Sequence, residues 1–197
     1  MADLLALDRA ATLWTNHHHS LALDALLLPV SWFGERGAGW LFIVLLMLIF
    51  GKRRERLVTL AFLVVLVVTE FLLMPQIRAA LPRPRPYQYL PGVRQCGVPW
   101  TTTSFPSAHV YLWVYATLFY GAIYRRQRWL LWTLTGLTMY ARPYCGMHHI
   151  GDAMGGAVLG LTVGLPMLVL VTKWGWTEEG LESRVVGSEP AQPAHDP

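Results

Sequence analysis

The chain has 197 residues, of which 54% are hydrophobic and only 14% are charged. A soluble domain carries roughly 25% charged residues, so this composition excludes an ordinary soluble protein and predicts an integral membrane protein. The formal net charge of +4 does not indicate a nucleic-acid partner, because the basic residues cluster beside apolar segments, as they do at the cytoplasmic ends of membrane helices.

The first segment, residues 1–19, predicts an interfacial amphipathic helix. Apolar residues recur at helical spacing over residues 2–17, but Asp3, Asp8 and Arg9 make the segment too polar to span a membrane. The N-terminus has no basic region followed by an apolar run and a cleavage site, so no cleavable signal peptide is expected.

A series of apolar segments then predicts a membrane-embedded helical domain over residues 20–173. Residues 20–33 and 38–50 are each shorter than the roughly 20 residues that a span needs, so they form two short spans or one span and a helix that does not cross; we favour two spans. Residues 57–74, 107–124, 129–140 and 150–172 predict further spans. The fold class is therefore all-α, a polytopic membrane helical bundle with five to six transmembrane helices. Residues 174–197 are polar and predict a disordered cytoplasmic tail.

Two features of these segments have structural consequences. Glu70 lies inside an apolar span, where a carboxylate is expected to face protein or a polar cavity. The last span contains five glycines, which allow close contact between helices: Gly151, Gly155, Gly156, Gly160 and Gly164.

Residues 75–106 interrupt the pattern with seven prolines and four arginines. No single helix tolerates that density of proline, and a loop of this length is usually functional or disordered. Its aromatic residues and arginines favour an ordered functional loop.

The distribution of basic residues predicts the orientation. One predicted face carries Lys52, Arg53, Arg54, Arg56, Arg125, Arg126, Arg128 and Lys173, and we assign it to the cytoplasm. The opposite face carries Arg78, Arg83, Arg85, Arg94 and Arg142. The assignment therefore requires that several of these arginines have another role.

Three polar clusters are predicted on that non-cytoplasmic face. They are Arg78 to Pro86, Pro106 to His109, and Arg142 with His148 and Asp152. Guanidinium groups bind phosphate bidentately and keep their charge. Ser107 would lie near a helix N-terminus, where free N–H groups favour an anion.

The third cluster predicts nucleophilic chemistry. His148 and Asp152 are four residues apart, so on a helix they would share one face and hydrogen-bond. A carboxylate on one imidazole nitrogen fixes the tautomer and leaves the other nitrogen free to attack. His109 is then the candidate general acid for the leaving oxygen.

The three clusters resemble the signature of the type 2 phosphatidic acid phosphatases, the PAP2 superfamily, whose motifs read K-x6-R-P, P-S-G-H and S-R-x5-H-x3-D. Here they are Arg78-x6-Arg85-Pro86, Pro106-Ser107-Ala108-His109 and Ala141-Arg142-x5-His148-x3-Asp152. The chain departs from the pattern at three positions, with Arg78 in place of Lys, Ala108 in place of Gly and Ala141 in place of Ser.

The resemblance implies an enzyme with a PAP2-like fold that forms a phosphohistidine at His148. Asp152 would support this nucleophile and His109 would protonate the leaving group. Phosphate would be held by Arg78, Arg85, Ser107 and Arg142. No metal and no cofactor are implied.

Several neighbouring residues have simpler interpretations. Arg83 and Arg94 are expected to face solvent or lipid headgroups, and Trp100 to belong to an interfacial aromatic belt. Cys145 could in principle be a nucleophile, but the motif assigns that role to His148. Cys96 and Cys145 both fall on the predicted non-cytoplasmic side, and we hypothesise a disulfide between them.

The predicted activity is hydrolysis of a lipid phosphate, most simply undecaprenyl diphosphate to undecaprenyl phosphate, as in small bacterial members of the family. The expected partners are the lipid substrate and the bilayer of the bacterial inner membrane, with the site facing the periplasm. Phosphatidylglycerophosphate, phosphatidic acid and lipid A are alternative substrates. A lipid phosphotransferase and a non-enzymatic transporter or scaffold of the same fold are alternative functions.

Overall fold

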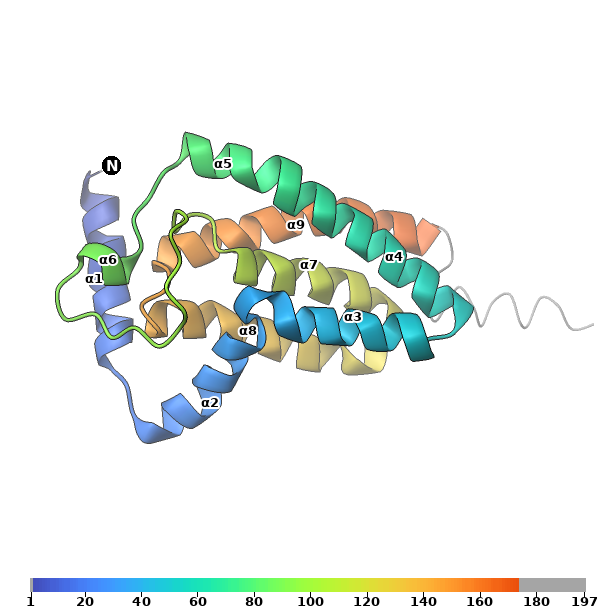
Figure 1. The fold of residues 1–197 in the computed structure, drawn as a ribbon, viewed down its shortest axis with the longest axis horizontal. Coiled ribbons are helices and arrows are strands. Elements are labelled where there is room, and N and C mark those ends of the chain that lie inside the picture. Colours follow the sequence, from blue (N-terminus) through green and yellow to red (C-terminus); the bar gives the residue numbers. More distant parts are fainter. Residues whose placement is uncertain (1, 174–197) are drawn as a thin grey trace, which may run out of the picture.

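The computed structural model describes residues 2–173, and within that range every regular element is helical (Figure 1). In chain order these are α1 (Ala2–His17), α2 (Leu21–Phe33), η1 (Glu35–Gly37), α3 (Ala38–Phe50), α4 (Arg53–Val68), η2 (Thr69–Leu73), α5 (Met74–Ala80), α6 (Pro86–Tyr89), α7 (Ala108–Ile123), η3 (Arg125–Gln127), α8 (Arg128–Tyr144) and α9 (Ile150–Lys173). The predicted tail at 174–197 lies outside the described residues. The all-α prediction is confirmed for the part described.

The proline-rich loop begins later than the sequence predicts. α4, η2 and α5 form one continuous helix of 28 residues, Arg53–Ala80, which passes through Pro75. η2 is a wide π-helical turn in which the Met74 N–H donates to the carbonyl of Thr69, five residues earlier. Such a turn gives a proline ring, which has no N–H to donate, a place within the helix.

α7 is the central helix of the bundle, packed against α8 and α9 (Figure 1). Its aromatic side chains form much of the core; Phe62 from α4 stacks on Tyr115 with ring centroids 4.6 Å apart. Gly156 and Gly160 on α9 bring the two backbones together, because a Cβ at Gly156 would lie only 2.4 Å from the carbonyl oxygen of Ser107. The predicted use of glycine on α9 therefore applies to the contact with α7.

The outer face of the bundle is apolar, as in a protein surrounded by lipid. Phe50, Phe71 and Val158 are each more than 60% exposed, and burial in hydrocarbon removes the penalty that water would impose. Two helices, Arg53–Ala80 and Ile150–Lys173, are long and apolar enough to cross a membrane, and α2 with α3 form a pair bent by 62° that could supply another span. The predicted count of five to six spans stays a prediction.

The bundle separates basic turns from the loop that carries the motifs. Figure 1 shows the α3–α4 and α7–α8 turns and the end of α9 at one end of the molecule, and the loop 81–107 and the α8–α9 turn at the other. α1 lies across this second end. The three motifs therefore meet at one end of the bundle.

The close approach of α7 and α9 predicts the effect of adding a methyl group to α9. In Gly160→Ala the new Cβ would lie 2.6 Å from the Val114 Cβ and 2.8 Å from the carbonyl oxygen of Tyr111. Because a backbone oxygen cannot move aside, we expect a loss of about 1–3 kcal/mol in the free energy of unfolding, measured by thermal or denaturant unfolding in detergent.

Gly136→Ala on α8 is the matched control, because a Cβ there meets no atom within 4 Å. It should keep or gain stability, by up to about 1 kcal/mol from helix propensity. Equal stability of the two variants would contradict the packing described here.

Candidate active site

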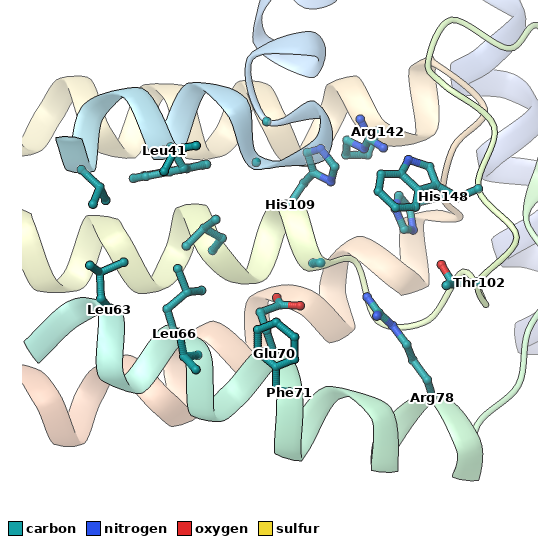
Figure 2. Close-up of a pocket in the computed structure, with 18 of the residues that line it drawn as sticks. Leu41, Leu63, Leu66, Glu70, Phe71, Arg78, Thr102, His109, Arg142 and His148 are labelled. Atoms are coloured by element: carbon teal, nitrogen blue, oxygen red, sulfur yellow. The ribbon is translucent and has the colours of Figure 1, made fainter. Parts of the chain in front are cut away.

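The motif residues surround a cavity of about 790 Å³ between α3, α4 and the start of α7 (Figure 2). Five of the residues predicted from sequence line it: Arg78, Arg85, His109, Arg142 and His148. In Figure 2 the two histidines and Arg142 are grouped at one end, with Arg78 pointing towards them, while Leu41, Leu63 and Leu66 line the other end. Ser107 and Asp152 are fully buried behind the wall.

One ring nitrogen of His148 is hydrogen-bonded to the backbone, and the other faces a guanidinium group. Its Nδ1 lies 2.8 Å from the carbonyl oxygen of Ser104, and because a carbonyl can only accept, Nδ1 carries the proton. Nε2 is then the nitrogen with the free electron pair, 3.1 Å from a terminal nitrogen of Arg85. Burial, followed by the charges of Arg85 and Arg142, holds the pKa of His148 well below its usual value. The imidazole is therefore neutral and able to act as a nucleophile.

The prediction of a hydrogen bond between His148 and Asp152 is wrong. The Asp152 carboxylate lies 3.9 Å from His148 Nδ1, which is too far for a hydrogen bond. The i, i+4 argument fails because α9 begins only at Ile150, so His148 precedes the helix. Asp152 instead accepts from the backbone N–H of His149, at 2.7 Å, and from its Nδ1, at 3.1 Å.

Ser104 provides the connection that Asp152 does not make directly. Its hydroxyl donates to the Asp152 carboxylate while its carbonyl accepts from His148. Asp152 is thus connected to His148 through one intervening residue. Sequence reasoning missed Ser104, which lies outside the three motifs and is marked only as one member of a run of hydroxyl residues, 101–104.

Arg142 and Arg78 keep donor nitrogens that have no partner. Arg142 is fully buried, and one terminal nitrogen bonds to Ser31, at 2.9 Å, and to Glu35, at 3.3 Å. Its Nε and other terminal nitrogen have no partner, and neither does the Nε of Arg78. Burial, then the charge of Arg142, lowers the pKa of Arg85 to about 10, so Arg85 remains charged at neutral pH.

Other buried polar atoms at the site also lack a partner. They include His109 Nε2, the Ser107 hydroxyl and the Trp100 indole N–H. Such groups are costly to bury unsatisfied. His109 and Trp100 line the cavity together with Arg78 and Arg142, so an anion in the cavity would find hydrogen-bond donors there. Trp100 was assigned to an aromatic belt, but it lines this cavity. Glu35 was missed because no local signal connects it to Arg142, 107 residues away.

Two arginines expected to face solvent or lipid have protein partners instead. Arg83 bridges Asp152, at 2.8 Å, and Asp8 of α1, at 2.5 Å. Burial lowers the pKa of Arg83, but the two carboxylates outweigh burial and raise the pKa above its usual value. Arg94 forms a bidentate pair with Asp24, both distances being 2.8 Å. These ion pairs hold the long loop in place.

The two cysteines are free but adjacent in this structure. The Cys96 N–H donates to the Cys145 carbonyl at 3.2 Å, and a hydrogen bond between the thiols lowers the pKa of Cys96 to about 7 and raises that of Cys145. Cys145 is fully buried, which makes it a poor nucleophile. The disulfide stays a hypothesis.

Comparison with known proteins agrees with the family resemblance of the three motifs. Residues 59–176 match the PAP2 superfamily. Over 62 residues the chain is 36% identical to the lipid A 4'-phosphatase of Porphyromonas gingivalis, a stretch that covers 30% of this chain and about a quarter (26%) of that protein. The crystal structure of Aquifex aeolicus LpxE shares the fold, with a TM-score of 0.66 and 22% identity over 83% of this chain and 93% of that one.

The environment of His148 predicts a pH profile. Because the pKa of His148 lies well below the usual histidine value, the imidazole stays neutral when the pH falls below that usual value. The acid limb of kcat/KM should therefore lie below the usual pKa of histidine. Arg85→Gln removes a charge beside Nε2, so the pKa of His148 rises and the acid limb of kcat/KM moves to higher pH, besides any loss of rate.

Arg126→Gln, at an exposed position in η3, controls for the change in net charge and should leave the acid limb in place. An acid limb that does not move in Arg85→Gln would count against the assignment of His148 Nε2.

Proposed function

Because this chain belongs to the PAP2 superfamily, we propose that it is an integral membrane phosphatase that removes a terminal phosphate from a lipid through a phosphohistidine at His148. The observation that carries the proposal is that Arg78, Arg142 and Trp100, which line the same cavity as His148, have buried donors with no partner. A phosphate monoester supplies the oxygens that these donors lack.

The geometry supports an in-line displacement at phosphorus. His148 Nε2 attacks the phosphorus, the bond to the lipid oxygen breaks, and His109 gives a proton to that oxygen. A water molecule then attacks the phosphorus, giving a proton to His109, and the phosphorus–nitrogen bond breaks to release inorganic phosphate. The three arginines, Arg78, Arg85 and Arg142, balance the charge on the phosphoryl oxygens in both steps.

The apolar end of the cavity supports a lipid rather than a soluble phosphate. Leu41 and Val44 of α3 face Leu63, Leu66 and Val67 of α4. Hydrocarbon chains would contact these side chains, while the phosphate occupies the arginine end. The two ends of one cavity match the two parts of a membrane lipid phosphate.

A phosphorylated glycolipid of the lipid A kind is our first candidate substrate. One relative is a lipid A 4'-phosphatase, whereas undecaprenyl diphosphate has no support among the compared proteins and becomes the second candidate. Glu70 also favours a glycolipid: it lies between the leucines and the arginines of the cavity (Figure 2), where a carboxylate accepts hydrogen bonds from sugar hydroxyl or amide groups and repels a second phosphate. Phosphatidylglycerophosphate and phosphatidic acid remain further candidates.

The separation of charges supports a location in the bacterial inner membrane with the site on the periplasmic side. The turns rich in Lys and Arg lie at the end opposite the loop 81–107 (Figure 1), and such turns face the cytoplasm. The arginines at the cavity end are occupied by carboxylates or directed at the phosphate site.

A lipid phosphotransferase would use the same residues, and differs only in whether water or an acceptor hydroxyl attacks the phosphohistidine. A non-enzymatic transporter or scaffold is disfavoured, because the nucleophile, its supporting carboxylate and the acid are all present at the cavity. Phosphate release in the absence of an acceptor lipid separates hydrolysis from transfer.

The main test is phosphate release from a panel of lipid phosphates in mixed micelles, with phosphoenzyme trapped by rapid acid-free denaturation. We expect release from at least one lipid, and an acid-labile, base-stable phosphoenzyme that His148→Ala abolishes together with turnover. Full turnover in His148→Ala would refute the proposed mechanism.

Substitution of Glu70 tests the headgroup. In Glu70→Leu, kcat/KM for a phosphorylated glycolipid should fall roughly 10-fold to 100-fold, as expected for lost hydrogen bonds to a charged acceptor, while the value for undecaprenyl diphosphate stays the same or rises. Glu70→Gln, of the same shape but uncharged, should show an intermediate loss. An equal fall in kcat/KM for every lipid would mean that Glu70 does not distinguish between headgroups.

A further inference from the structure

One face of the N-terminal helix α1 is buried against the active-site end of the bundle. Asp8, Thr12 and Asn16 are spaced by four residues, so they share this face. Thr12 and Asn16 are fully buried, whereas most other side chains of the helix are exposed. A helix that only lies on a membrane surface turns its apolar side inward; here the inward side is polar, and each polar group has a partner.

Asp8 and Thr12 satisfy the free N–H groups at the start of α9. The Gly151 N–H donates to Asp8 Oδ1 at 2.8 Å, and the Ile150 N–H donates to the Thr12 hydroxyl at 3.2 Å. These are helix-terminal donors that have no partner within their own helix. Gly151 is required for this approach, because a Cβ there would lie 2.9 Å from the other Asp8 oxygen. α1 therefore caps α9 from a distant part of the chain.

The same carboxylate is the first member of a chain of contacts that ends at His148. Asp8 Oδ2 pairs with Arg83 at 2.5 Å, and the other terminal nitrogen of Arg83 pairs with Asp152 at 2.8 Å. Asp152 accepts from the Ser104 hydroxyl, and the Ser104 carbonyl accepts from His148 Nδ1. Arg83 also holds Ser104 directly, since its carbonyl accepts from the Ser104 N–H at 2.7 Å.

Asn16 holds the other side of the α8–α9 turn. Its amide nitrogen donates to the carbonyls of Tyr144, at 2.7 Å, and Arg94, at 2.8 Å, and its amide oxygen accepts from the Arg94 N–H, at 2.8 Å. α1 thus contacts the chain just before and just after the segment 145–149 that carries the nucleophile. It also contacts the long loop that carries Ser104 and Arg85.

We propose that α1 is a positioning element of the active site, in which Asp8 acts through Arg83 and Asp152 to hold His148 with Nε2 directed at the phosphate. α1 lies outside residues 59–176, the part of the chain that matches the family. The inference rests on the proposed function, since it assigns His148 as the nucleophile. Asp8 is a positioning residue and touches no reacting atom.

The test compares Asp8→Asn with Asp3→Asn in the full chain, in the same detergent. Asp3 lies on the same helix but is exposed, so its variant should match the wild type. In Asp8→Asn, kcat should fall roughly 10-fold to 100-fold, the cost of misplacing a reacting group by about 1 Å, while KM changes by less than about 3-fold because the phosphate ligands remain.

A double-mutant cycle with Arg83→Gln separates positioning from general support of the fold. If Asp8 acts through Arg83, the double variant should be no slower than Arg83→Gln alone. Unchanged kcat in Asp8→Asn would overturn the proposal. So would a loss of kcat that multiplies in the double variant, or one that merely follows a fall in thermal unfolding temperature.

A second readout separates failure of this inference from failure of the proposed function. If the wild type releases phosphate from no lipid, the proposed function fails. The orientation of His148 can still be followed by the rate at which diethyl pyrocarbonate acylates its side chain, with the modified residue identified by mass spectrometry. A rate that changes several-fold in Asp8→Asn but not in Asp3→Asn supports the positioning role, and equal rates refute it.

Discussion

The hydrogen bond between His148 Nδ1 and the carbonyl of Ser104 decides which nitrogen of the imidazole is free, and much of the site is built around keeping that bond in place. The carbonyl belongs to a loop residue, so it has to be fixed from several directions. Arg83 holds the Ser104 N–H, Asp152 holds its hydroxyl, and α1 holds Arg83 in turn. A backbone oxygen makes a good orienting group because, unlike a side chain, it cannot change rotamer once its loop is fixed.

Two buried guanidinium groups, those of Arg85 and Arg142, and the half-buried Arg78 line one cavity, and together they carry a large electrostatic cost. Glu35 offsets part of it at Arg142, but Arg142 and Arg78 keep donors without partners. In the absence of an anion these donors are destabilising, since an unsatisfied buried polar group costs about 1–3 kcal/mol. A phosphate bound as proposed above would accept from these donors, and the cost that it removes would add to the affinity for the substrate.

The sequence predicts those parts of this protein that depend on local pattern. Apolar length predicts the helices, and motif spacing predicts that Arg78, Arg85, His109, Arg142 and His148 meet at one cavity. It fails where the answer depends on where a helix begins or on distant contacts. The His148–Asp152 bond was expected from helical spacing, but α9 starts two residues after His148; the helix was expected to end before Pro75, but a wide turn carries it to Ala80. The partners of Arg83 and Arg142 lie about 70 and 107 residues away, beyond the reach of any local signal.

The position of α1 also bears on the number of times that the described part of the chain crosses the membrane. α1 is attached to the cavity end of the bundle by Asp8 and Asn16, whereas the last described helix, α9, ends among the basic turns at the opposite end (Figure 1). A chain whose first and last elements lie on opposite sides crosses an odd number of times. For the described residues, the arrangement agrees with the lower of the two predicted counts, five, if the bent pair α2 and α3 forms one span.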